Sequence, residues 1–166
     1  MLSDDDARPV SCVVRRATPA DARVAATIIA GALAEYGLPF EPEGRDADVA
    51  RFGSIDENDD LVAIDRASGL PIGVASIGPQ GADGVGWVSK VFVAKKARRR
   101  GAGRALMTAL HDAARARGYQ EIGLRTRVVF REAIALYEAH GYSRREEPSA
   151  VLTSGDIVYY RRVPPE

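Results

Sequence analysis

The sequence has few residues that could cross-link the chain or hold a metal ion. Its single cysteine, Cys12, excludes an internal disulfide and fits a reducing cytoplasm. Its two histidines, His111 and His140, lack the spacing of metal ligands, and no cluster of His, Cys and carboxylate residues accompanies them. We therefore expect a cytoplasmic protein with no metal site.

Long apolar runs and an excess of charge of one sign are also missing. The longest apolar stretch, around Val24–Ala34, is interrupted by Thr27 and Gly31 and is too short to cross a bilayer. The N-terminus lacks the basic start and apolar core of a signal peptide. Lys and Arg total 23, as do Asp and Glu, so no overall field favours nucleic acid or membrane. These absences predict a soluble protein that binds neither a membrane nor nucleic acid.

The balanced charges are unevenly distributed along the chain. Glu35–Asp60 contains nine acidic residues and two basic ones, whereas Lys95–Arg104 contains six basic residues and no acid. Two local fields of opposite sign indicate one anionic ligand and a second, cationic one. A basic run alone is also typical of a solvated surface or a weak nucleic-acid site, but no aromatic residues interleave with this one. Nucleic-acid binding therefore ranks last among the hypotheses.

The length of 166 residues suits one domain. We expect residues 1–9 to form a frayed leader and residues 10–166 to form a single α/β domain with a mixed sheet. The predicted helices are Ala22–Tyr36, a short one near Ala47–Phe52, Gly101–Arg117 and Arg131–His140. The predicted strands are Val10–Arg16, Leu61–Ile64, Ile72–Ile77, Val85–Val93, Ile122–Thr126 and Ile157–Val163.

The most informative segment joins the strand Val85–Val93 to the helix that follows it. A strand that enters a glycine-containing turn and opens a helix presents unpaired backbone N–H groups to a ligand. Gly101 and Gly103 permit a close approach to the backbone, and the helix dipole adds roughly half a positive charge. Guanidinium groups supply paired donors for phosphate oxygens at Arg98, Arg99, Arg100 and Arg104. The segment predicts a pyrophosphate site.

The spacing within this turn excludes two common nucleotide-binding loops. Gly103 is followed by Arg104 and Ala105 rather than by the Lys and Ser or Thr of a Walker A loop, and position 106 is Leu where a dinucleotide fingerprint needs a third glycine. The pattern Arg98-x-x-Gly101-x-Gly103 instead resembles motif A of the GNAT superfamily of N-acetyltransferases. The resemblance is strong over Val85–Tyr142 and includes the segments Val91-Phe92-Val93, Arg104-Ala105-Leu106, Arg117-Gly118-Tyr119 and Ala133-Ile134-Ala135-Leu136-Tyr137-Glu138-Ala139-His140-Gly141-Tyr142.

This resemblance implies a fold and an activity. The fold would be a GNAT-like α/β/α sandwich whose twisted central sheet is mixed, mostly antiparallel, and split between strands four and five. The activity would be transfer of the acetyl group of acetyl-CoA to a primary amine by direct attack in a ternary complex. A protein that binds acyl-CoA without turnover is the alternative. The acceptor would be a small-molecule or peptide amine, and because dimers are common among similar proteins a homodimer is an open alternative.

The resemblance also implies roles for particular residues. Backbone groups of Val91 and Val93 would pair with the pantetheine arm, and the Val91 amide would polarise the thioester carbonyl. The main chain from Arg98 to Arg104, including Ala102, would cradle the pyrophosphate. Tyr137 would be the general acid that protonates the CoA sulfur. A core aromatic is the other interpretation of Tyr137, and both hold if the ring is buried and the hydroxyl faces the donor.

Two residues depart from the family pattern. Trp87 stands where many relatives have Glu, which removes the obvious general base, and Phe130 stands where many have Asn, so stacking or apolar contact would replace a polar contact with the pantetheine. Glu35 and Tyr36 end the first predicted helix and are candidates for acceptor binding, although a solvated helix end is an equal alternative. If the Glu35–Asp60 segment lines the acceptor groove, cationic acceptors such as polyamines would be preferred.

Overall fold

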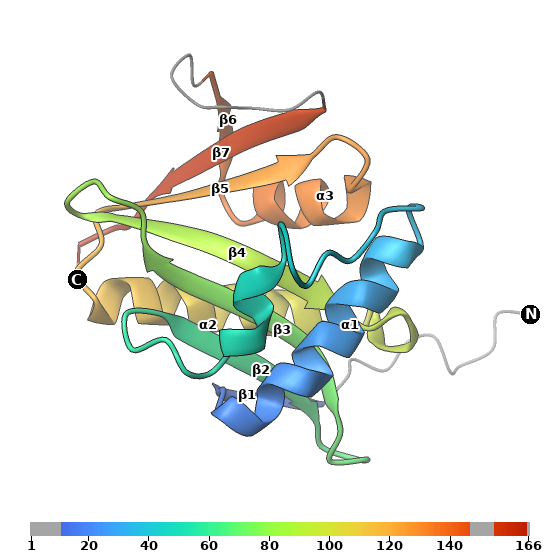
Figure 1. The fold of residues 1–166 in the computed structure, drawn as a ribbon. Helices are drawn as coiled ribbons and strands as arrows, with labels where there is room; N and C mark the ends of the chain where they lie inside the picture. The colour runs from blue at the N-terminus through green and yellow to red at the C-terminus, as the bar shows by residue number, and fades with distance from the viewer. Residues whose placement is uncertain (1–10, 147–154, 166) are drawn as a thin grey trace, which may run out of the picture.

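The computed structural model describes residues 11–146 and 155–165, in which seven strands form one sheet between helices (Figure 1). The strand order is β1-β2-β3-β4-β5-β7-β6, and every neighbouring pair is antiparallel except β4 and β5. The strands are β1 Cys12–Arg16, β2 Asp59–Asp65, β3 Pro71–Pro79, β4 Val85–Val93, β5 Glu121–Arg127, β6 Ser143–Arg145 and β7 Asp156–Arg162. The prediction of a mixed, mostly antiparallel sheet is confirmed.

The helices are α1 Ala22–Ala34, α2 Ala102–Ala116 and α3 Arg131–Ala139, with 3₁₀ helices at Pro19–Asp21, Ala47–Arg51 and Lys95–Ala97. The start of α1 is fixed locally. The Asp21 carboxylate accepts the Thr18 backbone N–H at 2.8 Å and two bonds from Arg15. These bonds and the positive charge of Arg15 lower the pKa of Asp21. The helix α1 ends at Ala34, two residues before the predicted end at Tyr36, and Gly37 with φ +67° then turns the chain away from the helix axis.

Two apolar cores lie on opposite faces of the sheet. On one face, α2 and α3 bury side chains such as Leu106, Leu110 and Tyr137 against Ile77 and Leu124. On the other face, α1 and the 3₁₀ helix Ala47–Arg51 bury Ile29, Val49 and Phe52 against Val62 and Val74. In Figure 1, α1 crosses in front of the sheet and α2 lies behind it. The result is an α/β/α sandwich, as predicted.

The split in the sheet runs between β4 and β5. These strands pair only where residues 85–88 meet residues 121–124. From Ser89 to Val93, β4 has β3 on one side and no strand on the other within the described chain. We call this opening the gap.

An extra residue in β4 lies where the gap begins. Ser89 is opposite Ser76 and Phe92 is opposite Val74, so three steps along β4 match two steps along β3. Lys90 has φ +56°, a conformation that non-glycine residues seldom adopt. The irregularity is a β-bulge, and bulges bend a strand and increase its twist. The sequence analysis predicted one uninterrupted strand here and missed the bulge.

Other differences from the sequence analysis are small. The edge strand β6 and the 3₁₀ helix Lys95–Ala97 were not predicted, whereas the six predicted strands and four predicted helices occur within a few residues of their expected ends. The predicted leader, residues 1–9, and the first residue of the predicted strand Val10–Arg16 lie outside the described residues. Across residues 11–146 and 155–165, no helix has the length and hydropathy to span a bilayer, and no three or more His, Cys, Asp or Glu side chains are arranged to hold a metal ion.

Candidate functional site

The turn at residues 98–101 carries the chain from β4 into α2. Gly101 has φ +95°, and a Cβ built on it meets no atom within 4 Å, so the turn conformation rather than crowding requires glycine here. No side chain caps α2, whose first helical hydrogen bond runs from the Ala105 N–H to the Gly101 carbonyl at 3.0 Å. The N–H groups of residues 102–104 therefore have no partner one turn earlier and are available to an anion.

Gly103 has a packing role in addition to any role in ligand approach. An ideal Cβ at this position would lie 3.2 Å from Leu136 Cδ2 on α3. Glycine thus lets α2 and α3 pack closely at the base of the turn. The sequence analysis assigned Gly103 only to the phosphates.

The arginines of the turn fall into two groups. Arg99, Arg100 and Arg104 are exposed. Arg98 is committed to protein contacts: its Nε donates to the Val93 carbonyl at 2.9 Å, and its Nη1 and Nη2 donate to the two Glu35 oxygens at 2.7 and 2.5 Å. The hydrogen bonds and charge of Glu35 raise the pKa of Arg98. The structure therefore joins a residue predicted to bind the donor to one predicted to bind the acceptor.

The open edge of β4 faces the gap. The Ala94 N–H donates to the Ile72 carbonyl on β3 at 2.7 Å. Because successive residues of a strand direct their backbone groups to opposite sides, those of Val93 and Val91 point away from β3 and into the gap. Their side chains pack in the core beneath α2 and α3, whereas Phe92 packs beneath α1. The two backbone positions predicted to pair with pantetheine thus lack a strand partner within the described chain.

Tyr137 lies on α3 with its ring in the core and a side chain only 6% exposed. Burial raises its pKa above the usual value, so the phenol is protonated at neutral pH. The described residues offer its hydroxyl no hydrogen bond, yet every solvent-inaccessible side-chain N or O atom among them has a partner. The Tyr137 oxygen is therefore not completely enclosed, although the residue as a whole is buried.

A buried polar cluster beside Tyr137 was missed by the sequence analysis, which considered His111 only as a metal ligand and excluded that role. The His111 Nε2 lies 3.0 Å from the Tyr142 hydroxyl, and the Arg161 Nη1 lies 2.6 Å from His111 Nδ1. The same Arg161 Nη1 lies 3.1 Å from Nε2, so the guanidinium contacts both nitrogens of the imidazole. Burial, followed by the charges of Arg161 and His140, lowers the pKa of His111 to about 4. The cluster ties α2 to β7 with a neutral imidazole.

Aromatic rings flank the gap on the α1 side. Phe130 precedes α3 and makes edge contacts with Tyr36 at 4.9 Å and Phe92 at 6.4 Å between ring centroids. Trp87, found where a Glu was expected from the family pattern, packs edge to face with Tyr160 at 6.1 Å. Phe130, predicted to contact the pantetheine, thus also joins the end of α1 to the start of α3.

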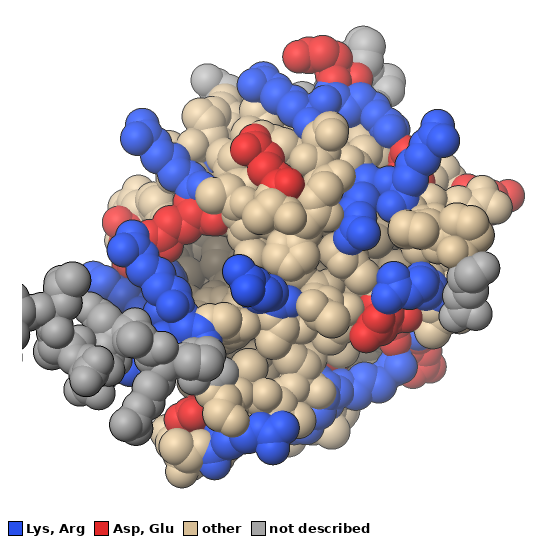
Figure 2. Space-filling model, turned by 180° about the vertical axis from the view of Figure 1, so that it is seen from behind, with Lys and Arg blue, Asp and Glu red and all other residues tan. Residues whose placement is uncertain are grey.

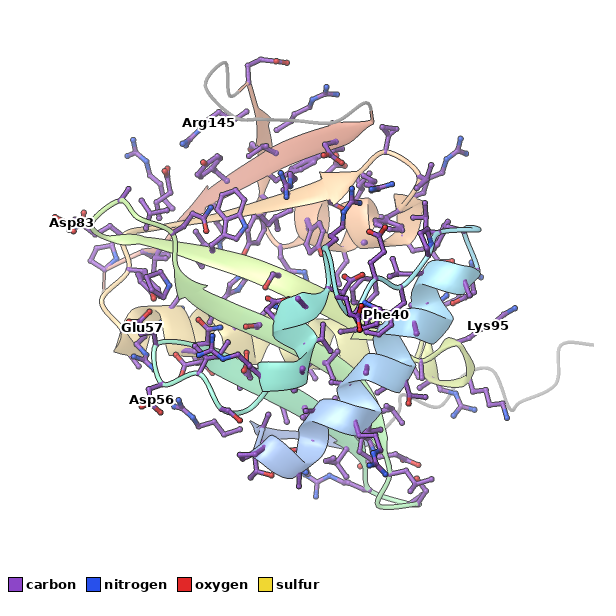
Figure 3. The ribbon with its side chains drawn as sticks, in the orientation of Figure 1. Phe40, Asp56, Glu57, Asp83, Lys95 and Arg145 are labelled. Atoms are coloured by element: carbon purple, nitrogen blue, oxygen red, sulfur yellow. The ribbon has the colours of Figure 1, made fainter. Side chains whose placement is uncertain are left out.

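Several acidic side chains of the Glu35–Asp60 segment form ion pairs within the protein. Asp48 binds Lys90 at 2.5 Å, and Asp59 binds Arg16 at 2.7 Å and Arg117 at 2.8 Å. Figure 3 places Asp56 and Glu57 at the end of the molecule opposite Lys95 and the basic turn. Most acids of this segment are therefore either paired or remote from the turn.

The face seen from behind carries a hollow (Figure 2). It lies on the left of that view, which is the side where α3 and the turn into α2 appear on the right of Figure 1. Blue Lys and Arg side chains border it below and red Asp and Glu side chains border it above. A hollow with a basic border on this side suits a ligand that carries phosphates at one end.

Comparison with known proteins gives one family and one fold. A family model described as "Acetyltransferase (GNAT) family" matches residues 29–142, more than half of the chain. A search of curated proteins finds no match. Among solved structures, a GNAT-family acetyltransferase from Staphylococcus aureus superposes with a TM-score of 0.78 at 16% identity, covering 93% of this chain and 100% of that one.

Two further structures have the same fold. PaiA N-acetyltransferase from Thermoplasma acidophilum, solved in complex with coenzyme A, superposes with a TM-score of 0.73 at 12% identity, covering 92% of this chain and 99% of that one. A ribosomal-protein-alanine N-acetyltransferase from Brucella melitensis superposes with a TM-score of 0.69 at 24% identity, covering 90% and 99%. At these identities the likeness extends to the fold alone.

Proposed function

The chain belongs to the acetyltransferase (GNAT) family, and from this we propose that it is an N-acetyltransferase that moves an acetyl group from acetyl-CoA to a primary amine by direct attack in a ternary complex. The observation that carries the proposal is that two stretches of backbone without a helix or strand partner lie next to each other in the described chain: the N-terminus of α2 and the open edge of β4. The first suits a pyrophosphate, and the second suits an amide-bearing chain that adds to the sheet.

Donor binding would use the main chain more than side chains. The N–H groups of residues 102–104 would donate hydrogen bonds to the pyrophosphate oxygens, and Arg99, Arg100 and Arg104 would add positive charge around them. Val91 and Val93 would pair with the two amides of the pantetheine. Arg98, already bonded to Glu35 and Val93, would contribute through its backbone and by holding the turn in place.

Acetyl transfer would use two hydrogen-bond donors of this chain at the thioester, one for the carbonyl oxygen and one for the sulfur. When bound, acetyl-CoA supplies an activated acyl group whose leaving group is a thiolate. The Val91 N–H would stabilise the negative charge that develops on the carbonyl oxygen. The Tyr137 hydroxyl would donate its proton to the departing sulfur, a role that suits a phenol that is protonated at neutral pH.

The acceptor amine must lose a proton before or during attack. Trp87 cannot accept one, so we propose that water or an earlier equilibrium removes it. An acyl-CoA-binding protein without turnover remains the second candidate, and the Trp at position 87 is the observation that favours it.

Turnover and donor binding are tested separately. Release of CoA thiol in the presence of a panel of primary amines is expected for an N-acetyltransferase. Tight acetyl-CoA binding with no thiol release for any amine in the panel would instead support the binding protein.

The donor site is tested by a charge-reversal pair. Arg100→Glu with Arg104→Glu should weaken acetyl-CoA binding by about tenfold or more in calorimetry, because both side chains are exposed beside the N-terminus of α2. The matched control, Lys95→Glu with Lys96→Glu, makes the same change of net charge at exposed residues before the turn. Equal loss of affinity in the two double variants would contradict a site at the helix terminus.

A further inference from the structure

The side from which the acceptor approaches follows from the proposed donor site. The Tyr137 ring and the N-terminus of α2 lie with the core beneath α2 and α3, so the donor would occupy that side of the gap. Direct attack needs the amine on the other side of the thioester carbon. The acceptor would therefore enter the gap from the α1 side.

Trp87 lies on that side, at the closed end of the gap. Trp87, Gly123 and Tyr160 are aligned across β4, β5 and β7. Val88 follows Trp87 and Tyr159 precedes Tyr160, and both are buried in the core beneath α2 and α3. Since side chains alternate along a strand, the Trp87 ring projects to the α1 side, one residue before β4 and β5 cease to pair.

The position of the Trp87 ring is fixed by its surroundings. An ideal Cβ at Gly123 would lie 2.6 Å from Trp87 Cζ3 and 2.7 Å from Tyr160 Cε1, so both rings lie directly over this glycine. The Arg145 guanidinium lies 3.8 Å from the centroid of the Tyr160 ring and binds Glu121 at 2.7 and 3.0 Å. Trp87 is nonetheless only half-buried, which leaves part of its ring accessible.

Aromatic residues form only 7% of the sequence, yet they gather at both ends of the gap. Trp87 and Tyr160 lie at the closed end, and a second group lies where α1 meets α3, formed by Tyr36, Phe92 and Phe130. The Tyr36 side chain is 38% exposed. The rings thus offer apolar surface to a molecule that enters between them.

Three carboxylates in the elements that flank the gap are paired with basic side chains. Glu35 binds Arg98, Asp48 binds Lys90, and Glu121 binds Arg145. A dication would have to break these pairs to bind these three carboxylates, whereas an uncharged group would leave the pairs intact. The charge pattern therefore complements an apolar body better than a polyamine, in contrast to the expectation from the acidic run in the sequence.

We propose that the acceptor is a primary amine attached to an aromatic or bulky apolar group, and that Trp87 is the specificity-determining residue against which this group packs. This inference rests on the acetyl-transfer function proposed above. A π-face supplies dispersion and stacking contact, and the discrimination it gives between acceptors is about tenfold or more.

The single tryptophan permits a binding test that needs no turnover. Phenylethylamine, propylamine and spermidine are titrated into the protein saturated with CoA while Trp87 fluorescence is recorded. We expect phenylethylamine to change the emission at a concentration about tenfold below that of propylamine. An unchanged emission with phenylethylamine, or a response to spermidine at lower concentration, overturns the proposal.

Turnover of the same three amines tests the residue. The kcat/KM for phenylethylamine should exceed that for propylamine about tenfold, Trp87→Ala should remove the preference, and Trp87→Phe should keep most of it. Denaturation curves establish that both variants fold. Thiol release with no preference among the amines overturns the acceptor class and leaves acetyl transfer intact, whereas no release with any amine overturns the transfer function itself.

Discussion

The two halves of strand β4 differ in what surrounds them. Residues 85–88 have strands on both sides. A Cβ at Gly86 would collide with Tyr119, and a Cβ at Gly123 on the paired strand β5 would collide with Trp87 and Tyr160. Within the described residues, positions 89–93 have a strand on one side only, and the backbone groups on their other side face the gap. We infer that the closed half supplies stability, while the open half supplies the groups that bind and react.

The largest expected effect lies beside the open half, at Tyr137. Tyr137→Phe should lower kcat about 10²-fold with little change in acetyl-CoA affinity, because the hydroxyl acts only as the thiolate leaves. The free energy of unfolding should be nearly unchanged, since the ring stays in the core and the hydroxyl has no hydrogen bond within the described chain. Steady-state kinetics and chemical denaturation measure the two effects.

The matched control is Tyr159→Phe. Tyr159 is also buried beneath α2 and α3, but its hydroxyl donates to Glu138 Oε1 at 2.9 Å. Its loss should cost about 1 kcal/mol of stability and leave kcat unchanged. Full turnover by Tyr137→Phe, under conditions where chemistry limits the rate, would make Tyr137 a core aromatic and nothing more.

A second expected effect lies in the closed half, at Gly123. Gly123→Ala would place a Cβ 2.6 Å from Trp87 Cζ3, so the rings or strands must shift, at a cost of about 1–3 kcal/mol in the free energy of unfolding. Acetyl-CoA affinity should change little because the open half is not touched. Thermal unfolding and calorimetry measure these quantities.

Gly31→Ala in α1 is the control for this substitution. A Cβ at Gly31 meets no atom within 4 Å, and alanine favours the helix, so this variant should be about 0.5–1 kcal/mol more stable. A Gly123→Ala protein as stable as the parent chain would show that the closed half is not tightly packed around Trp87.

The smallest effect is a dependence of stability on pH through His111. His111 on α2 contacts Arg161 on β7. Arg161 is aligned across the sheet with Ile122 on β5 and Gly86 on β4, so this contact anchors α2 to the closed half of β4. The pKa of His111 is lowered to about 4 by burial and Arg161, below the ordinary value near 6.5, so the unfolded chain binds more protons between these pH values. The stabilisation is complete above pH 6.5 and is lost as pH falls toward 4, by about 1–2 kcal/mol.

Denaturation at pH 7, 5 and 4 tests this dependence against His111→Gln. The variant lacks the titrating group, and its free energy of unfolding should fall less over the same range. Equal slopes for the two proteins would show that the acid sensitivity comes from carboxylates elsewhere.

The sequence predicted features that depend on neighbouring residues, and it missed those that depend on distant ones. The turn into α2 was visible because Gly101, Gly103 and the arginines lie within one short segment. The pair of Arg98 with Glu35 joins residues 63 positions apart, so no local pattern indicated it. The support of Trp87 likewise comes from β5, β6 and β7 and required the aligned sheet.

The basic and acidic runs show why composition alone misleads about a site. Both were interpreted as ligand fields, yet Arg98, Lys90 and Arg117 neutralise Glu35, Asp48 and Asp59. Pairing of this kind depends on tertiary structure. The distribution of charge along the chain therefore overstated the charge available to a ligand.

The bulge at Lys90 sets the tolerance of β4 to changes in length. Upstream of it the odd-numbered Trp87 faces α1, and downstream the even-numbered Phe92 does so. Removing one residue here would restore regular alternation along β4 and leave Phe92 on the α1 side, with Val91 and Val93 still on the opposite side. The strand can therefore lose the bulge residue without inverting the approach to the α2 turn, whereas losing one residue from the regular part of β4 would exchange the two faces.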